Sequence, residues 1–177
     1  FVFVHGGYWL KFDKSYWSHL AGGMLARGWA VAMPSYDLCP DVRICDITKQ
    51  ISRAVGLAAQ RVPGPIVLAG HSAGGHLVAR MVCKGVLDDH VDARLGHVMP
   101  ISPVSDLRPL LKTSMNSDFG MDIAAAVLES PVLNENRLDV PVTTWVGADE
   151  RPVFLDQARG LADAWDSRHV IEPGKHH

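Results

Sequence analysis

Cysteines, runs of one charge and long apolar stretches are all scarce in this sequence of 177 residues. The three cysteines, Cys39, Cys45 and Cys83, are odd in number and lack metal-ligand spacing, which argues against a disulfide framework and a zinc site. No apolar run is long enough to cross a bilayer, and no basic stretch followed by an apolar run marks an export signal. We therefore expect reduced thiols, a cytoplasmic location and no membrane contact.

Charge is nearly balanced along the chain, with 17 lysines and arginines against 19 aspartates and glutamates. No basic cluster provides the electrostatic surface that nucleic acids or anionic membranes require. With 47% hydrophobic residues, the chain can bury a core of its own. These features argue against a nucleic-acid partner and favour a small, roughly neutral molecule as the partner.

Short apolar runs alternate with amphipathic segments throughout. FVFVH, PIVLAG and PVTTWVG are bounded by glycine or proline, as buried parallel strands are, and WAVAMPSY, GHVMPIS and RHVIEP are further strand candidates. Helical spacing of apolar residues predicts helices over 13–28, 41–62, 73–84, 121–129 and 152–165. Asp41 is the expected cap of the second helix. The alternation predicts a single α/β domain over 1–177, with a mainly parallel sheet and helices on both faces.

The segment LAGHSAGGHL contains a GxSxG motif, in which Gly70, Ser72 and Gly74 lie between a predicted strand and a predicted helix. A serine nucleophile must sit on a tight, strained turn with its hydroxyl exposed, and glycines on either side remove side chains that would collide there. The motif therefore predicts Ser72 as a nucleophile for acyl transfer.

Acyl transfer passes through an oxyanion, which requires backbone N–H donors that are already in place. VFVHGGYW offers the amides of Gly6 and Gly7, and also that of Tyr8, directly after a strand, and Ala73 follows the nucleophile. We predict that Gly6, Gly7 and Ala73 form the oxyanion hole. His5 is interpreted as a structural residue that fixes the loop.

A serine hydroxyl needs a histidine base and an orienting carboxylate, which follow the serine in the order acid, then histidine. TTWVGADERPVF places Asp149 and Glu150 after a late strand, and both are candidates for the acid. After the last predicted strand the only histidines are His176 and His177. Terminal histidines can belong to an affinity tag, but the required order makes this pair the candidates for the base. No HExxH pattern indicates a metal site.

Four segments, HGGYW, LARGWAVAMPSYDLCPDVRICDI, GHSAGGHL and VGADERPVF, together resemble the kynurenine formamidase (arylformamidase) family. These are α/β hydrolases close to the hormone-sensitive-lipase-like esterases, and the resemblance extends over essentially the whole chain. It implies hydrolysis of N-formyl-L-kynurenine to L-kynurenine and formate in tryptophan breakdown, without a metal or an organic cofactor. Since esterases carry a segment related to SYDLCP, a carboxylesterase for small acyl esters stays open as the alternative.

The resemblance also bears on the open choices at the site. Relatives commonly place the acid three residues after the glycine that closes its strand, which favours Glu150 over Asp149. They place the base three residues after a turn glycine, which favours His177 over His176. The aromatic residues expected to line the substrate pocket are Tyr8, Trp9 and Tyr36, whereas core packing is the favoured role of Phe119.

Family members begin before the HGG strand and continue into a helix after the histidine. We therefore interpret the sequence as an α/β-hydrolase fragment truncated at both ends, without the upstream strands and the terminal helix. A fraying terminus holds an imidazole poorly, so low activity is expected of it. A homodimer stays open for the full-length protein. A third hypothesis is a catalytically silent binding protein of the same fold.

Overall fold

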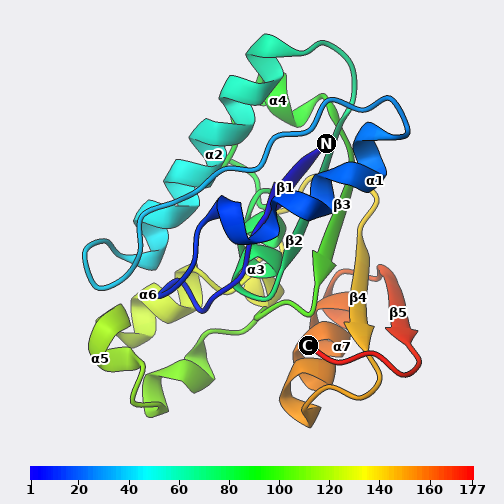
Figure 1. Ribbon diagram of the computed structural model, residues 1–177. Coiled ribbons are helices and arrows are strands. Elements are labelled where there is room, and N and C mark those ends of the chain that lie inside the picture. The colour runs from blue at the N-terminus through cyan, green and yellow to red at the C-terminus, as the bar shows by residue number, and fades with distance from the viewer.

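The computed structural model describes all 177 residues, which form one five-stranded sheet with helices packed against it (Figure 1). The strands are β1 (Val2–Val4), β2 (Ile66–His71), β3 (Leu95–Ile101), β4 (Thr143–Gly147) and β5 (Arg168–Glu172). They lie in the order β1-β2-β3-β4-β5, and every neighbouring pair is parallel. The predicted parallel α/β sheet is confirmed, and the carboxyl ends of all strands meet at one edge.

Helical segments connect the strands. They are α1 (Ala21–Leu25), α2 (Ile44–Arg61), α3 (Ala73–Arg80), α4 (Asp89–Asp92), α5 (Asn116–Phe119), α6 (Ile123–Leu128), α7 (Pro152–Ala164) and the 3-10 turns η1 (Lys14–Leu20), η2 (Arg108–Lys112) and η3 (Pro131–Leu133). Helix α3 packs against β1, β2 and β3, and α7 packs against β4 and β5. Figure 1 shows α2 outside α3 and α7 below the strands β4 and β5. No helix of the chain is both long enough and apolar enough to pass through a membrane.

Helix α2 shows why the core forms where it does. Its buried side chains include Ile44, Ile47 and Ile51, which recur every three or four residues and join the main apolar cluster of the molecule. The amphipathic helix predicted here is confirmed, but its predicted cap is wrong. The helix begins at Ile44 with Arg43 at its N-cap, because the carboxylate of Asp46 accepts a hydrogen bond from the Arg43 amide and fixes the first turn.

One predicted strand is absent. Residues 29–36 run beside β1, but only Ala32 forms a β-bridge, with Val2. The N–H of Phe3 donates to Ala32 O, and the N–H of Ala32 donates to Phe1 O, both at 2.9 Å. Pro34 has no N–H to donate, so the ladder cannot continue through WAVAMPSY.

The predicted helix over 13–28 is shorter than expected. It is replaced by the 3-10 turn η1 and the five-residue helix α1, and no residue of either is buried. Adjacent glycines at Gly22 and Gly23 have low helix propensity, which accounts for the short α1. Leu20 and Leu25 remain 41% and 56% exposed. Much of the apolar side of this segment therefore faces solvent instead of a core. The predicted helices 73–84 and 121–129 are also shorter, at Ala73–Arg80 and Ile123–Leu128.

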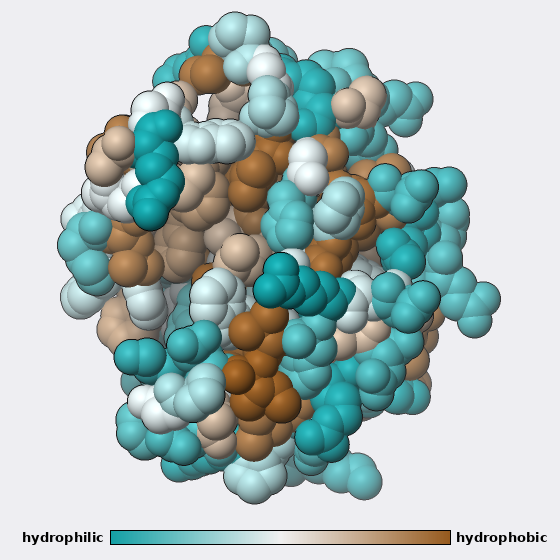
Figure 2. All heavy atoms as spheres, turned by 90° about the vertical axis from the view of Figure 1, so that its right-hand side faces the viewer, coloured by the Kyte–Doolittle hydropathy of each residue, from teal (hydrophilic) through white to brown (hydrophobic).

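Side chains alternate between the two faces of the sheet, and these two faces are unequally buried. Val4 of β1 points into the main apolar cluster, whereas the ring of Phe3 lies 6.3 Å from that of Trp17 in η1 on the other face. Further along this second face, Met99 of β3 and Trp145 of β4 are only half-buried. Figure 2 looks from the side of β4 and β5 and shows apolar side chains between polar ones.

Gly74 sets how closely α3 approaches the sheet. A Cβ atom at this position would overlap the carbonyl oxygens of Val4 and His5, which are backbone atoms and cannot turn away. We expect Gly74→Ala to lower the free energy of unfolding by about 1–3 kcal/mol, measured by urea denaturation. Gly56→Ala in α2 is the matched control, because a Cβ atom there meets nothing within 4 Å. Equal stability of the two variants would contradict this account of α3.

Candidate active site

Ser72 lies on the sharp turn between β2 and α3. Its φ of 56° and ψ of −116° are strained for a residue with a side chain. The N–H of Ser72 donates to Ile101 O at 2.8 Å, and the N–H of His76 donates to Ser72 O at 3.0 Å. Gly70 completes the turn, because a Cβ atom there would overlap the carbonyl oxygen of Gly74. The turn holds the serine at the carboxyl edge of the sheet, as the GxSxG motif predicts.

Three side chains far apart in the sequence form one hydrogen-bonded chain at this edge. Nε2 of His177 lies 3.0 Å from Oγ of Ser72, and Nδ1 of His177 lies 2.7 Å from Oε2 of Glu150. In the tautomer with its proton on Nδ1, the imidazole donates to Glu150 and accepts from the serine hydroxyl. This is the order of contacts that lets a histidine withdraw the proton of a serine.

Glu150 is buried and held by further donors. Its Oε1 accepts hydrogen bonds from the Gly147 amide at 2.9 Å and from the Ser102 hydroxyl at 2.5 Å. Burial by itself raises the pKa of Glu150, but the bonds from Ser102, Gly147 and His177 outweigh it and hold the pKa below its ordinary value. The carboxyl group is therefore ionised at neutral pH.

Two rings pack against the imidazole of His177. The ring of Phe154, from the first turn of α7, stacks on it with a centroid distance of 3.9 Å and an interplanar angle of 26°. His71 lies on it at 4.6 Å with a tilt of 45°. Burial, and secondarily the neighbouring His177, lower the pKa of His71 to about 4. His71 is therefore uncharged at neutral pH and packs against His177 as a neutral ring.

Asp149 and His176, the alternatives for acid and base, lie outside this hydrogen-bonded chain. Both are exposed, and Nδ1 of His176 contacts the backbone oxygen of Asp149, not its carboxylate. The Asp149 amide donates to the carbonyl oxygen of Lys175 at 3.0 Å. This backbone contact ties the loop after β4 to the last turn of the chain, so that Glu150 and His177 meet.

The backbone of the HGG segment lies directly against the serine turn. A Cβ atom on Gly6 would lie 2.8 Å from His71 O and 3.0 Å from Ser72 Cβ, and Gly7 has a φ of +116°. The N–H groups of Gly6 and Gly7 donate to no acceptor in the protein. The N–H of Ala73 lies in the first turn of α3, where an amide has no intrahelical partner. These three amides are available to an oxyanion.

Tyr36, an expected pocket residue, belongs to the support of the HGG segment instead. Its hydroxyl donates to His5 O at 2.9 Å, and its ring stacks on the imidazole of His5 at 4.3 Å and 8°. Nδ1 of His5 contacts Gly6 O at 2.8 Å. Both side chains are buried, so the prediction for Tyr36 is corrected and His5 has the structural place expected of it.

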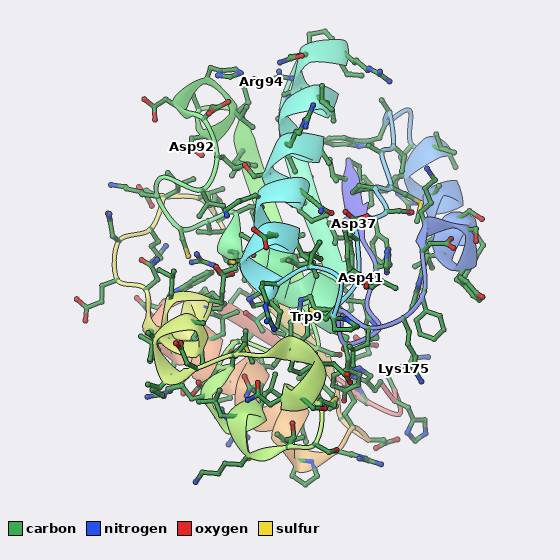
Figure 3. The ribbon with its side chains drawn as sticks, turned by 90° about the vertical axis from the view of Figure 1, so that its left-hand side faces the viewer. Trp9, Asp37, Asp41, Asp92, Arg94 and Lys175 are labelled. Atoms are coloured by element: carbon green, nitrogen blue, oxygen red, sulfur yellow. The ribbon has the colours of Figure 1, made fainter.

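Trp9 was expected to line the substrate pocket, and this prediction is also wrong. The tryptophan is 0% exposed and packs edge-on against His76 and Phe119, at 5.1 and 5.7 Å. Figure 3 labels it near the middle of the view. It therefore fills the core, as Phe119 was expected to do. Tyr8 is half-buried, whereas the other two predicted pocket aromatics are buried.

A family model described as the α/β hydrolase fold matches residues 1–170. The chain belongs to the α/β hydrolase family. Among curated relatives, the kynurenine formamidase of Drosophila melanogaster is 30% identical over 92% of this chain, and that of Danio rerio is 27% identical over 94%. The predicted resemblance to kynurenine formamidases is confirmed. The chain spans 59% of the length of each of these relatives.

Solved structures of other hydrolases share the fold. A crystal structure from Silicibacter sp. TM1040, named as a candidate thioesterase, is 66% identical, with a TM-score of 0.98 over 99% of this chain and 67% of that chain. Esterase 2 of Thermogutta terrifontis in its apo form is 23% identical, with a TM-score of 0.80 over 99% of this chain and 72% of that chain. The second likeness shows the fold alone.

The cavities of the protein do not by themselves show where a substrate would bind. One cavity, of about 640 Å³, runs along α2 and does not reach Ser72. A cavity of about 380 Å³ touches Glu150 and Ser102 and is lined also by Met99 of β3 and Trp145 of β4. No group of three or more histidine, cysteine, aspartate or glutamate side chains has a geometry that could hold a metal ion.

Sequence reasoning missed three side chains that shape this candidate site. Ser102 comes directly after β3, so a strand prediction places it at the carboxyl edge, but nothing local pairs it with Glu150. Phe154 stands in the VGADERPVF segment, and His71 stands in GHSAGGHL. Nothing in either segment indicates that its ring packs on the imidazole of His177.

Proposed function

We propose that Ser72, His177 and Glu150 form the catalytic triad of a serine hydrolase, which cleaves the formyl amide of N-formyl-L-kynurenine to L-kynurenine and formate. The continuous contact from Ser72 Oγ through the imidazole to the Glu150 carboxylate, at 3.0 and 2.7 Å, carries the assignment of the reaction type. The likeness to kynurenine formamidases supports the choice of substrate.

In the proposed reaction, Ser72 Oγ attacks the formyl carbon while His177 Nε2 takes the hydroxyl proton. The carbonyl oxygen becomes an oxyanion that the amides of Gly6, Gly7 and Ala73 stabilise. The tetrahedral intermediate breaks when the imidazolium returns its proton to the departing aniline nitrogen, which leaves a formyl ester on the serine. A water that loses a proton to the same imidazole then hydrolyses this ester and releases formate.

A second candidate function is hydrolysis of small acyl esters or thioesters. The 66% identical structure named as a candidate thioesterase favours it, because the same triad would serve a different leaving group. The two candidates differ in the bond that is broken and not in the nucleophile.

The substrate is tested by comparing kcat/KM for N-formyl-L-kynurenine, p-nitrophenyl acetate and acetyl-coenzyme A. We expect the formyl amide to be preferred, with kynurenine formation followed by its absorbance. A preference of about a hundredfold or more for either of the other substrates would contradict the formamidase assignment, because the ratio of kcat/KM values measures which substrate the site discriminates for. Ser72→Ala serves as the blank for background hydrolysis.

A further inference from the structure

Ser102 occupies an unusual backbone position next to the acid. It follows β3 directly, its side chain is 2% exposed, and its φ is +47°, a region that serine rarely adopts. Its N–H donates to Trp145 O at 2.6 Å, which joins the end of β3 to β4. Such strain persists only where the surrounding structure enforces it, and it concentrates at functional sites.

The hydroxyl of Ser102 and the amide of Gly147 donate to the same carboxylate oxygen, Oε1 of Glu150. The other oxygen, Oε2, is left to face Nδ1 of His177. The terminal torsion of a glutamate is soft, so an unsupported carboxylate rotates over a wide range. Two donors on one oxygen fix this rotation. Bonds to an ionised acceptor are also stronger than neutral ones.

We propose that Ser102 is a positioning residue for the reaction, whose hydroxyl turns the Glu150 carboxylate so that Oε2 holds His177 in the tautomer that accepts the proton of Ser72. The inference rests on the proposed function for the role of the triad. Among the contacts that lower the pKa of Glu150, the bond from Ser102 is the largest, which agrees with a role in keeping the carboxylate ionised.

Two substitutions test the hydroxyl separately from the backbone. Ser102→Gly removes it and also relieves the positive φ, whereas Ser102→Ala removes it and keeps the strain. We expect kcat to fall roughly 10- to 100-fold in both variants, as for the loss of a hydrogen bond to a charged group, with KM little changed. The acidic limb of the pH–rate profile should move to higher pH, because a carboxylate that has lost a donor is easier to protonate.

Ser105→Ala is the matched control. Ser105 is buried three residues further along the same loop, and its hydroxyl donates to Gln157 O at 2.7 Å without touching Glu150. We expect wild-type kcat and an unchanged acidic limb. A loss in Ser105→Ala equal to that in Ser102→Gly would overturn the positioning role, since destabilisation of the loop would then explain both.

A measurement that does not depend on catalysis separates the role of Ser102 from the proposed function. The proton shared by His177 Nδ1 and Glu150 should give a low-field NMR signal in the wild type and in Ser105→Ala, and this signal should broaden or shift in Ser102→Gly. An unchanged signal or an unchanged kcat in Ser102→Gly overturns the role of Ser102. A wild-type protein that shows the signal but no hydrolysis dependent on Ser72 contradicts the proposed function instead.

Discussion

Ser72→Ala is expected to lower kcat by about 10⁴- to 10⁶-fold, the range seen when the nucleophile of a triad is removed. The hydroxyl has no substitute in the site, because His177 and Glu150 can activate a nucleophile but cannot replace it. The urea unfolding midpoint should stay close to the wild-type value, since alanine removes a single oxygen atom and keeps the backbone turn and its hydrogen bonds.

Ser114→Ala, at an exposed serine away from the triad, is the control for the effect of the substitution itself and should keep wild-type kcat. Activity of Ser72→Ala within about tenfold of the wild type would contradict the triad, because no loss of a nucleophile is that mild. The comparison is made with whichever substrate shows the highest kcat/KM.

Glu150→Gln is expected to lower kcat by roughly 10³- to 10⁴-fold. The neutral amide has a similar shape, but it can donate to His177 and so stabilise the tautomer that presents a proton to Ser72 and cannot accept one. Steady-state kinetics at pH 7 and 8 measure the effect. KM should change little, because the Glu150 carboxylate is engaged by His177, Ser102 and Gly147 within the protein.

Asp149→Asn makes the same chemical change at the neighbouring position. The Asp149 side chain is exposed and outside the hydrogen-bonded chain, so we expect this variant to keep nearly full activity. The opposite pattern, a large loss in Asp149→Asn and little change in Glu150→Gln, would make Asp149 the acid. The pair of variants therefore decides between the two carboxylates directly.

Local signals predicted much of the site. The place of Ser72 on its turn follows from the glycines on either side, because each removes a Cβ atom that would overlap backbone. The choice of Glu150 and His177 depended on spacing from a glycine, which the resemblance supplied. In the structure, these two side chains contact each other, and His177 also contacts Ser72.

Other features depend on contacts between distant segments and could not be read locally. Trp9 follows the HGG segment, but which way its ring points is decided by the space between His76 and Phe119. Ser102 and Glu150 lie 48 residues apart and meet only because β3 and β4 are neighbours. Tertiary packing, and not propensity, fixes these positions.

The fold was predicted best where a segment is buried on both sides. PIVLAG became β2 as predicted, since it lies between two parallel neighbours in the sheet. WAVAMPSY and the segment 13–28 were predicted least well. The first carries Pro34 at the edge of the sheet. The second has adjacent glycines, and much of its apolar side stays exposed, so its helical spacing did not produce a long buried helix.

Covalent labelling of Ser72 tests the central claim most directly. A fluorophosphonate reacts with a serine only when a neighbouring base activates the hydroxyl. After incubation with the wild-type protein, intact-mass measurement and peptide mapping should show one adduct, on the peptide that carries Ser72. Labelling should be absent in Ser72→Ala and much slower in Glu150→Gln. No adduct on the folded wild-type protein, or an adduct on another serine, would contradict the assignment of Ser72, His177 and Glu150 as a catalytic triad.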